Sequence, residues 1–422
     1  MNNIKNSFIK VLFILYLFFL SPLLLVQQLN RSIDSIPLVS SSQSQASNYS
    51  IYQSVKYEVE INFSLTHFMG PGNYMFKFSR LNNRIPNSTL TRDTPPYQES
   101  ALVFNQITGC KSSNIIQGHY DKFNNTYDLF NTSFFIDAFS KQVVSFNQKY
   151  SIILNDIRFQ NIEESEIGIY EKSDEIFSLY CNHSEPYYER DDPLLIELSN
   201  NIVDSNDNPV VKAEKICNWI SDNIEYNGNL PAQEKGALWA YTHLEGDCSE
   251  YSSLMVTLLR IQGIPARKVT GFLVSFDSDI RPKSGNTWNY YANKLASNIL
   301  THAWVEYYVP NSGWIACDPT WNSDKDYFNR IDFLRFATNV GANFFFPPSS
   351  IVSEFSNPTF SYNIGADYKF EYLIKITVIE SNLQSQEIGA FIFAITIGTT
   401  LGICLIIWIG LKIKKKHKRN SF

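Results

Sequence analysis

Alternation of apolar and polar residues marks the first half of the chain. Over residues 57–65, apolar side chains at every second position alternate with Glu, Asn and Ser, which is typical of a strand with one buried face. The same period, interrupted by turn residues, predicts further strands at 74–78, 101–107 and 150–159. We therefore expect residues 51–190 to form a β-sandwich-like domain, with the order of its strands left open.

The period changes to that of helices after Asp192 and Pro193. Apolar residues at helical spacing predict helices over 194–202, 213–224, 237–244 and 248–260. The remaining segments predict a strand at 268–275, a polar surface loop at 277–297, a hairpin at 302–318 and a last strand at 368–379. Together with the first half, this pattern predicts an α+β protein.

Both ends of the chain carry membrane signals. Lys5 and Lys10 precede the apolar run 11–26, which has the form of a secretory signal peptide, or of an uncleaved anchor because no clear cleavage site follows. Residues 388–411 are uncharged and long enough to cross a bilayer as a helix, and the basic residues after them are expected to stay in the cytoplasm. We therefore expect a single-pass or two-pass membrane protein whose folded part lies outside the cytoplasm.

A cysteine begins the fourth expected helix. Asp247 is a natural N-cap, and Glu250 three residues later completes a capping box. Cys248 therefore lies in the first turn, where unpaired N–H groups and the helix dipole favour a thiolate. The alternative is a small buried side chain without chemistry, because most cysteines are of that kind.

The expected hairpin carries a histidine and an aspartate at its open end. If a four-residue loop paired Val309 with Trp314, His302 and Asp318 would lie on opposite faces. A shift by one residue, such as a bulge at Gly313, would make them diagonal neighbours on one face, with Cβ atoms about 7–8 Å apart. An active site at this position needs that shift.

These three residues are of the types that nucleophilic catalysis requires. A thiol nucleophile needs a base, and the base needs a group that fixes its tautomer. Cys248, His302 and Asp318 can take these roles as nucleophile, base and orienting carboxylate. Glu306, on the same face as His302, competes with Asp318 for the orienting role. The alternative is a core histidine, a strand-end aspartate and an inert cysteine.

Four blocks of sequence around these residues resemble the transglutaminase-like superfamily. They are Gly-Asp-Cys-Ser-Glu-Tyr-Ser-Ser-Leu (246–254), Gly-Ile-Pro-Ala-Arg-Lys-Val-Thr-Gly-Phe (263–272), His-Ala-Trp-Val-Glu-Tyr-Tyr (302–308) and Gly-Trp-Ile-Ala-Cys-Asp-Pro-Thr (313–320). The resemblance covers about residues 192–321. It implies a papain-like fold with Cys248 as nucleophile, His302 as base and Asp318 as orienter, and acyl transfer from an amide through a thioester. The β-rich region before it resembles, more loosely, the domain that precedes this core in microbial members.

These patterns together predict an organisation along the chain. The expected parts are a signal peptide or N-terminal anchor (1–30), a Ser/Gln-rich linker (31–50), a β-rich domain (51–190), a transglutaminase-like catalytic domain (191–335), a membrane-proximal segment with a strand (336–387), a transmembrane helix (388–411) and a basic cytoplasmic tail (412–422).

Charge and cysteine content restrict the partners. The net charge is −6 and the charges are mixed along the chain, so no basic face predicts a nucleic-acid partner. No Cys/His pair in the second half has the spacing of metal ligands, so we expect no metal and no cofactor. The expected partners are a lipid bilayer and an extracytoplasmic protein or peptide substrate, and the oligomeric state stays open. Cys110 and Cys181 could form a disulfide, which the sequence does not decide.

The leading hypothesis is a membrane-anchored, outward-facing cysteine acyltransferase. A first alternative is a cysteine peptidase or amidase, in which water alone accepts the acyl group. A second is a catalytically silent adhesion or scaffold protein with the same fold. The complete set of Cys248, His302 and Asp318 argues against the silent protein.

Overall fold

The computed structural model describes residues 48–85, 94–134, 142–160, 162–231, 234–324, 326–341 and 359–382. Within these ranges no helix has the length and hydropathy needed to cross a membrane. The expected membrane segments at 11–26 and 388–411, and the basic tail, lie outside the described residues.

The largest element is a six-stranded sheet built around one long strand. Its order is β10-β16-β1-β6-β13, and β3 pairs with another part of β6. The strand bounds are β1 Tyr49–Met69, β3 Gln98–Thr108, β6 Gln142–Phe159, β10 Thr287–Asn293, β13 Arg330–Ile331 and β16 Asp367–Ser381. All the pairs are antiparallel. Alternate side chains of β1 are buried over most of its length, as the alternation in the sequence predicts.

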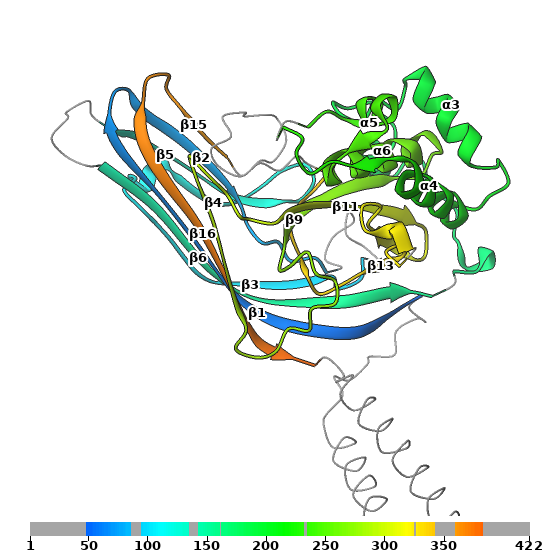
Figure 1. Cartoon of the computed structure of the whole chain (residues 1–422), viewed down its shortest axis with the longest axis horizontal. Helices are drawn as coiled ribbons and strands as arrows, with labels where there is room; N and C mark the ends of the chain where they lie inside the picture. Colours follow the sequence, from blue (N-terminus) through cyan, green and yellow to red (C-terminus); the bar gives the residue numbers. More distant parts are fainter. Residues whose placement is uncertain are drawn as a thin grey trace, which may run out of the picture. The chain divides into compact units, whose positions relative to one another are not determined.

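A second, four-stranded sheet packs on the first through aromatic side chains. Its order is β15-β2-β5-β4, with β2 at Gly72–Ser79, β4 at Ile115–Tyr120, β5 at Thr126–Phe134 and β15 at Thr359–Tyr362. Phe63 of β1 and Phe146 of β6 each lie 4.9 Å, between ring centroids, from Phe78 of β2. Because these rings bury large apolar areas between the two sheets, they form the centre of a β-sandwich. The strands of the two sheets are labelled in Figure 1.

The sandwich takes strands from distant parts of the sequence. β16 lies between β1 and β10, and pairs with β1 from Val55–Ser381 to Met69–Asp367. The segment 277–297, expected to be a surface loop, contains β10, so that expectation is wrong for residues 287–293. Tyr368, Phe370, Tyr372, Ile374 and Ile376 of β16 all point into the same core as β1. The division into parts predicted from the sequence stays a prediction, but the sheet uses strands from both sides of its boundaries at 190 and 335.

The helices pack on a separate four-stranded sheet of order β12-β11-β9-β14. Its strands are β9 Ala266–Leu273, β11 Thr301–Val309, β12 Gly313–Cys317 and β14 Arg335–Val340. The helices are α2 Glu175–Tyr180, α3 Pro193–Ile202, α4 Pro209–Asn223, α5 Ala237–His243 and α6 Cys248–Ile261. The short strands β7 Glu225–Tyr226 and β8 Glu245–Gly246, and 3-10 turns at Ser112–Asn114, Glu164–Glu166 and Asn322–Asp324, complete the described elements.

Helix α6 lies at the centre of this second part. It contacts α3, α4 and α5 on one side and β9 and β11 on the other (Figure 1). Its residues from Glu250 to Arg260 are all buried, among them Leu254, Met255 and Leu258. A helix that is buried on all sides is held in place by its surroundings, so its first residue has a fixed position.

Buried polar contacts join the sandwich to the helical part. The hydroxyl of Tyr57 donates to the carbonyl of Phe333 (3.0 Å), and that of Tyr97 to the carbonyl of Trp314 (2.7 Å).

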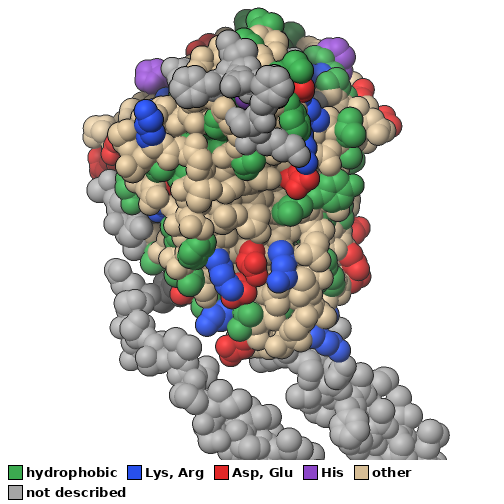
Figure 2. All heavy atoms as spheres, turned by 90° about the vertical axis from the view of Figure 1, so that its left-hand side faces the viewer, with side chains coloured by type: hydrophobic (Ala, Val, Ile, Leu, Met, Phe, Trp, Pro, Cys, Tyr) green, Lys and Arg blue, Asp and Glu red, His purple; other side chains and the backbone are tan. Residues whose placement is uncertain are grey.

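On the surface of the sandwich, a cross-strand ion pair joins Lys149 to Glu58 (2.9 Å). Figure 2 shows one face of the molecule, on which basic and acidic side chains lie side by side and apolar side chains are scattered.

Replacing a core residue of β16 tests whether this late strand stabilises the sandwich. Ile374→Ala removes a side chain that is 1% exposed, and we expect the free energy of unfolding to fall by about 2–5 kcal/mol. Its neighbour Leu373 is 46% exposed on the other face, so Leu373→Ala should cost much less. Urea denaturation of the full chain measures both. Equal effects of the two substitutions would contradict the burial of β16.

Candidate active site

The start of α6 has the cap that the sequence predicts. The carboxylate of Asp247 accepts the N–H of Ser249 (2.7 Å), and Glu250 accepts the N–H of Asp247 (3.1 Å), so the capping box is complete. A second oxygen of Glu250 accepts the N–H of Lys235 (3.0 Å) and ties the preceding loop to the helix. Cys248 is the first residue of the helix and is partly buried.

The hairpin has the register that the site requires. Val309 pairs with Gly313 and Val305 with Cys317, so the loop contains only three residues. Asn311 and Gly313 both have positive φ (70° and 82°), which this tight loop needs and which Gly adopts without steric cost. Continuing the pairing places Asp318 diagonally from His302 on the same face. The structure therefore contains the one-residue shift, from Trp314 to Gly313 as the partner of Val309, that places both residues on one face.

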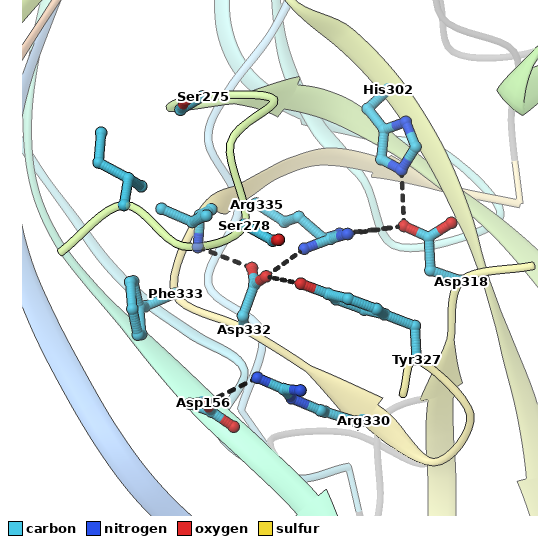
Figure 3. Close-up of polar contacts among 12 residues, drawn as sticks. Asp156, Ser275, Ser278, His302, Asp318, Tyr327, Arg330, Asp332, Phe333 and Arg335 are labelled. Atoms are coloured by element: carbon cyan, nitrogen blue, oxygen red, sulfur yellow. Dashed lines mark hydrogen bonds and ion pairs between the residues drawn. The ribbon is translucent and has the colours of Figure 1, made fainter. Parts of the chain in front are cut away.

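His302 and Asp318 form a buried hydrogen bond. The distance from Nε2 of His302 to Oδ2 of Asp318 is 2.7 Å. Burial acts to raise the pKa of Asp318, but His302 and Arg335 outweigh it and hold the pKa at about 2. Because Asp318 is then a carboxylate, Nε2 of His302 carries the hydrogen and donates it. The other ring nitrogen, Nδ1, points away from Asp318 (Figure 3).

The thiol of Cys248 lies against the strand that carries His302. Its sulfur accepts a hydrogen bond from the backbone N–H of Ala303, the residue after His302. Burial, and then the charge of Asp247, raise the pKa of the Cys248 thiol, while the Ala303 N–H and Lys268 act in the opposite direction. The helix start was expected to favour a thiolate, but desolvation is the larger effect here. Burial at this position therefore favours the neutral thiol over the thiolate.

Two further side chains, of Lys268 and Tyr226, lie near Cys248. Lys268 is buried, and its ammonium donates to the hydroxyls of Ser249 and Ser253 (both 3.1 Å) and pairs with Glu234. Tyr226, in β7, is 53% exposed, and burial, followed by the charge of a Cys248 thiolate, raises its pKa to about 12. The structure thus places a buried cation and an exposed aromatic ring near Cys248.

An arginine, a second aspartate and a tyrosine extend the site beyond the residues predicted from the sequence. Arg335 donates to Oδ2 of Asp318 from Nε (3.1 Å) and Nη2 (2.9 Å), and its Nη1 lies 2.6 Å from Asp332. The hydroxyl of Tyr327 donates to Asp332 (2.7 Å), and Figure 3 shows Arg335 between the two carboxylates. No motif or periodicity in the sequence singles out these three residues, because the residues between the hairpin and β14 show no regular alternation of apolar and polar positions.

Glu306 does not take the orienting role that the sequence left open for it. It is fully buried and pairs with Arg84 and with Arg267 (2.8 Å). Burial acts to raise its pKa, but the two guanidinium groups outweigh that effect and lower it. Both carboxylate oxygens are occupied away from His302, so Asp318 is the carboxylate that binds the histidine.

None of the five described cysteines takes part in a disulfide. Cys110, Cys181, Cys217, Cys248 and Cys317 are all free thiols, so the structure does not pair Cys110 with Cys181. Cys404 lies outside the described residues. In the part of the chain that the structure describes, no group of three His, Cys, Asp or Glu side chains is arranged to hold a metal ion.

A family model identifies a transglutaminase-like domain in this chain. Residues 196–319 match the family model of the Transglutaminase-like superfamily. The match includes the first residue of α6 and the whole of the hairpin.

Individual relatives are similar over short stretches. The uncharacterized protein YebA of Bacillus subtilis is 36% identical over 88 residues, which are 21% of this chain and 11% of that protein. A protein-glutamine gamma-glutamyltransferase of Pseudomonas aeruginosa is 38% identical over 76 residues, 18% of this chain and 10% of that protein. The chain thus spans about a tenth of the length of these two relatives. A solved structure of a candidate cysteine protease from Cytophaga hutchinsonii covers 77% of this chain and 99% of its own, with 14% identity and a TM-score of 0.43.

Replacing Asp318 by asparagine should lower the free energy of unfolding more at neutral than at acid pH. The folded pKa of Asp318, about 2, lies below the unfolded value of about 3.9, so its ionisation stabilises the fold above about pH 4 and is lost as the pH falls through 2. This contribution is roughly 2–3 kcal/mol at pH 7 and about half of that at pH 3. Urea denaturation of both proteins at pH 7, 5 and 3 measures it. A difference that does not shrink at pH 3 would show that Asp318 is not held ionised.

Proposed function

We propose that this protein is a thiol-dependent enzyme that transfers acyl groups from protein or peptide amides, with Cys248 as nucleophile, His302 as base and Asp318 as orienting carboxylate. The observation that carries the proposal is the hydrogen bond between His302 and Asp318. The residue that follows His302 in the same strand, Ala303, donates its backbone N–H to the sulfur of Cys248. The superfamily match over residues 196–319 supports the same chemistry. We further infer that the core is papain-like, since a capped nucleophile helix is followed by a hairpin that carries the base.

In the first step, sulfur attacks the carbonyl carbon of the amide. The proton of the Cys248 thiol passes to Nδ1 of His302, which is the ring nitrogen not bound to Asp318. The raised pKa of the thiol favours transfer of the proton during the attack over a preformed ion pair. The electron pair of the carbonyl moves to its oxygen, and backbone N–H groups at the start of α6, including that of Cys248, are placed to stabilise this oxyanion.

In the second half of the reaction, the leaving nitrogen departs and an acceptor takes the acyl group. The tetrahedral intermediate expels ammonia or an amine, which takes the proton from His302, and a thioester to Cys248 remains. A primary amine or water then attacks the thioester while His302 accepts its proton, and this proton returns to the sulfur of Cys248 as the product leaves. An amine acceptor gives transfer, and water gives the hydrolysis of a peptidase or amidase.

We also propose that the domain is anchored to a membrane and lies outside the cytoplasm. The end of β16 lies beside β1, because the N–H of Ser54 donates to the side chain of Asn382 (2.6 Å) and the N–H of Asn382 to the carbonyl of Ser54 (3.2 Å). In the sequence, the apolar run 11–26 precedes the described strands and the run 388–411 follows them. Two apolar segments that flank one folded part suit its attachment to a bilayer.

A thiol-reactive probe tests for an activated nucleophile. We expect iodoacetamide to modify Cys248 in the full chain with a rate that rises between pH 5 and 9, because His302 must be neutral to accept the proton. His302→Ala should slow modification of the Cys248 peptide about 10²-fold at pH 7, as measured by mass spectrometry. His243→Ala, which changes an exposed histidine outside the site, is the control. Equal rates in wild type and His302→Ala would support a silent scaffold.

A competition between acceptors separates transfer from hydrolysis. With a glutamine-containing peptide and an excess of a labelled primary amine, a transferase should incorporate the amine into the peptide, and Cys248→Ala should abolish incorporation. Mass spectrometry distinguishes the amide product from the glutamate or cleaved peptide that water would give. Products of water alone would identify an amidase or peptidase, and no product above the Cys248→Ala background would contradict the proposed activity on glutamine.

A further inference from the structure

We propose that Arg335 is a positioning residue of this site: held in place by Asp332, it fixes the carboxylate of Asp318 and through it the orientation and protonation of His302. This inference rests on the proposed function. Arg335 does not reach the reacting atoms, so it acts through Asp318. The residue lies 17 positions beyond Asp318, at the beginning of β14.

The first observation is the way in which Asp318 is held. Its Oδ2 accepts from Nε2 of His302 (2.7 Å) and from two nitrogens of Arg335 (3.1 and 2.9 Å), and its Oδ1 accepts the N–H of Thr320 (3.2 Å). Arg335 and Asp318 both have a fully buried side chain. A planar guanidinium fixes direction as well as charge, so it determines where Oδ2 points and therefore how the imidazole ring is turned.

The second observation is that Arg335 is itself fixed on its far side. Asp332 lies 2.6 Å from Nη1, accepts the hydroxyl of Tyr327 (2.7 Å) and accepts the backbone N–H of Leu334 (2.9 Å). The guanidinium also lies against the rings of Trp321 and Tyr327, 4.5 and 4.6 Å from their centroids. The arginine therefore lies against two aromatic rings and between two carboxylates, and its hydrogen bonds connect it directly to Asp318 (Figure 3).

The charges of this network act on His302 with opposite signs. Asp318 and Asp332 carry two negative charges and Arg335 one positive charge, so these three residues are net negative, and a protonated His302 would neutralise them. Removing Arg335 favours protonation of His302 and Asp318, whereas removing the charge of Asp332 disfavours it. If Arg335 and Asp332 only filled space, replacing them would not shift the protonation of His302 in opposite directions.

Other charged or titratable groups also face the thiol and imidazole from the neighbouring elements. From α6 and its cap they are Cys248 and Asp247, from β9 Lys268, from β7 Tyr226, and from the segment after β12 Asp318. None of these is changed in the variants below, so their contributions are common to all the proteins compared.

The test compares the pH dependence of Cys248 alkylation by iodoacetamide in the full chain and its variants. The wild type gives an acid limb in which the rate rises as the thiol–imidazole pair loses a proton. In Arg335→Met this limb should move to higher pH by about one unit, and in Asp332→Asn to lower pH by a similar amount. Arg335→Lys keeps the charge but not the two hydrogen bonds that converge on Oδ2 of Asp318, so it should retain the midpoint and lose about 10-fold in rate.

A matched control separates positioning from general damage. Arg84→Met removes another buried arginine, whose partner Glu306 keeps Arg267, so it should lower stability without moving the midpoint. Urea denaturation of each variant identifies any that does not fold, and Asp332→Asn, which keeps the shape of its side chain, then provides the decisive comparison.

The outcomes separate this inference from the proposed function. Opposite shifts in Arg335→Met and Asp332→Asn, with none in Arg84→Met, support the positioning role. If the wild type has an acid limb that His302→Ala removes, but the folded variants share the wild-type midpoint or shift in one direction, only this inference is overturned. If wild type and His302→Ala behave alike, the proposed function fails as well.

Discussion

The pairing of Val309 with Gly313 leaves three residues in the loop between β11 and β12, and this register decides on which face of the hairpin Asp318 lies. A strand turns successive side chains to opposite faces, so a shift by one residue would turn Asp318 away from His302. Two positive φ angles, at Asn311 and Gly313, close the loop at this length. The hydrogen bond between His302 and Asp318 therefore depends on backbone geometry at the other end of the hairpin.

The second constraint is the removal of charge from water. Asp318, Asp332 and Arg335 are all buried, and each would be costly to bury alone. They are tolerated together because each carboxylate meets the guanidinium and further N–H or O–H donors. The same arrangement keeps Asp318 ionised, whereas burial favours the neutral form of the Cys248 thiol.

Local patterns predicted the parts of this molecule that depend on local interactions. The capping box at Asp247 and Glu250, the helix after it and the hairpin with its two candidate residues could all be recognised from neighbouring positions. The register was open, because loop length alone did not distinguish a four-residue turn from a bulge. The position of β16 beside β1 and the contact of Arg335 with Asp318 could not be predicted, because they depend on how distant segments are brought together. The superfamily resemblance is confirmed by the match over residues 196–319, whereas the expected membrane segments lie outside the described residues and stay predictions.

The pairing of β1 with β16 also sets the order in which the protein is completed. These strands lie at opposite ends of the described sequence, with 297 residues between Met69 and Asp367. At about 5–20 residues per second, a growing chain needs roughly 15–60 s to supply the partner of its first strand. During that time the edge of β1 that pairs with β16 is uncovered, although the helical part, whose contacts are closer in sequence, is already made. Among the described strands, the last to be synthesised thus completes the sheet that the first begins, and a chain released before β16 lacks an inner strand of that sheet.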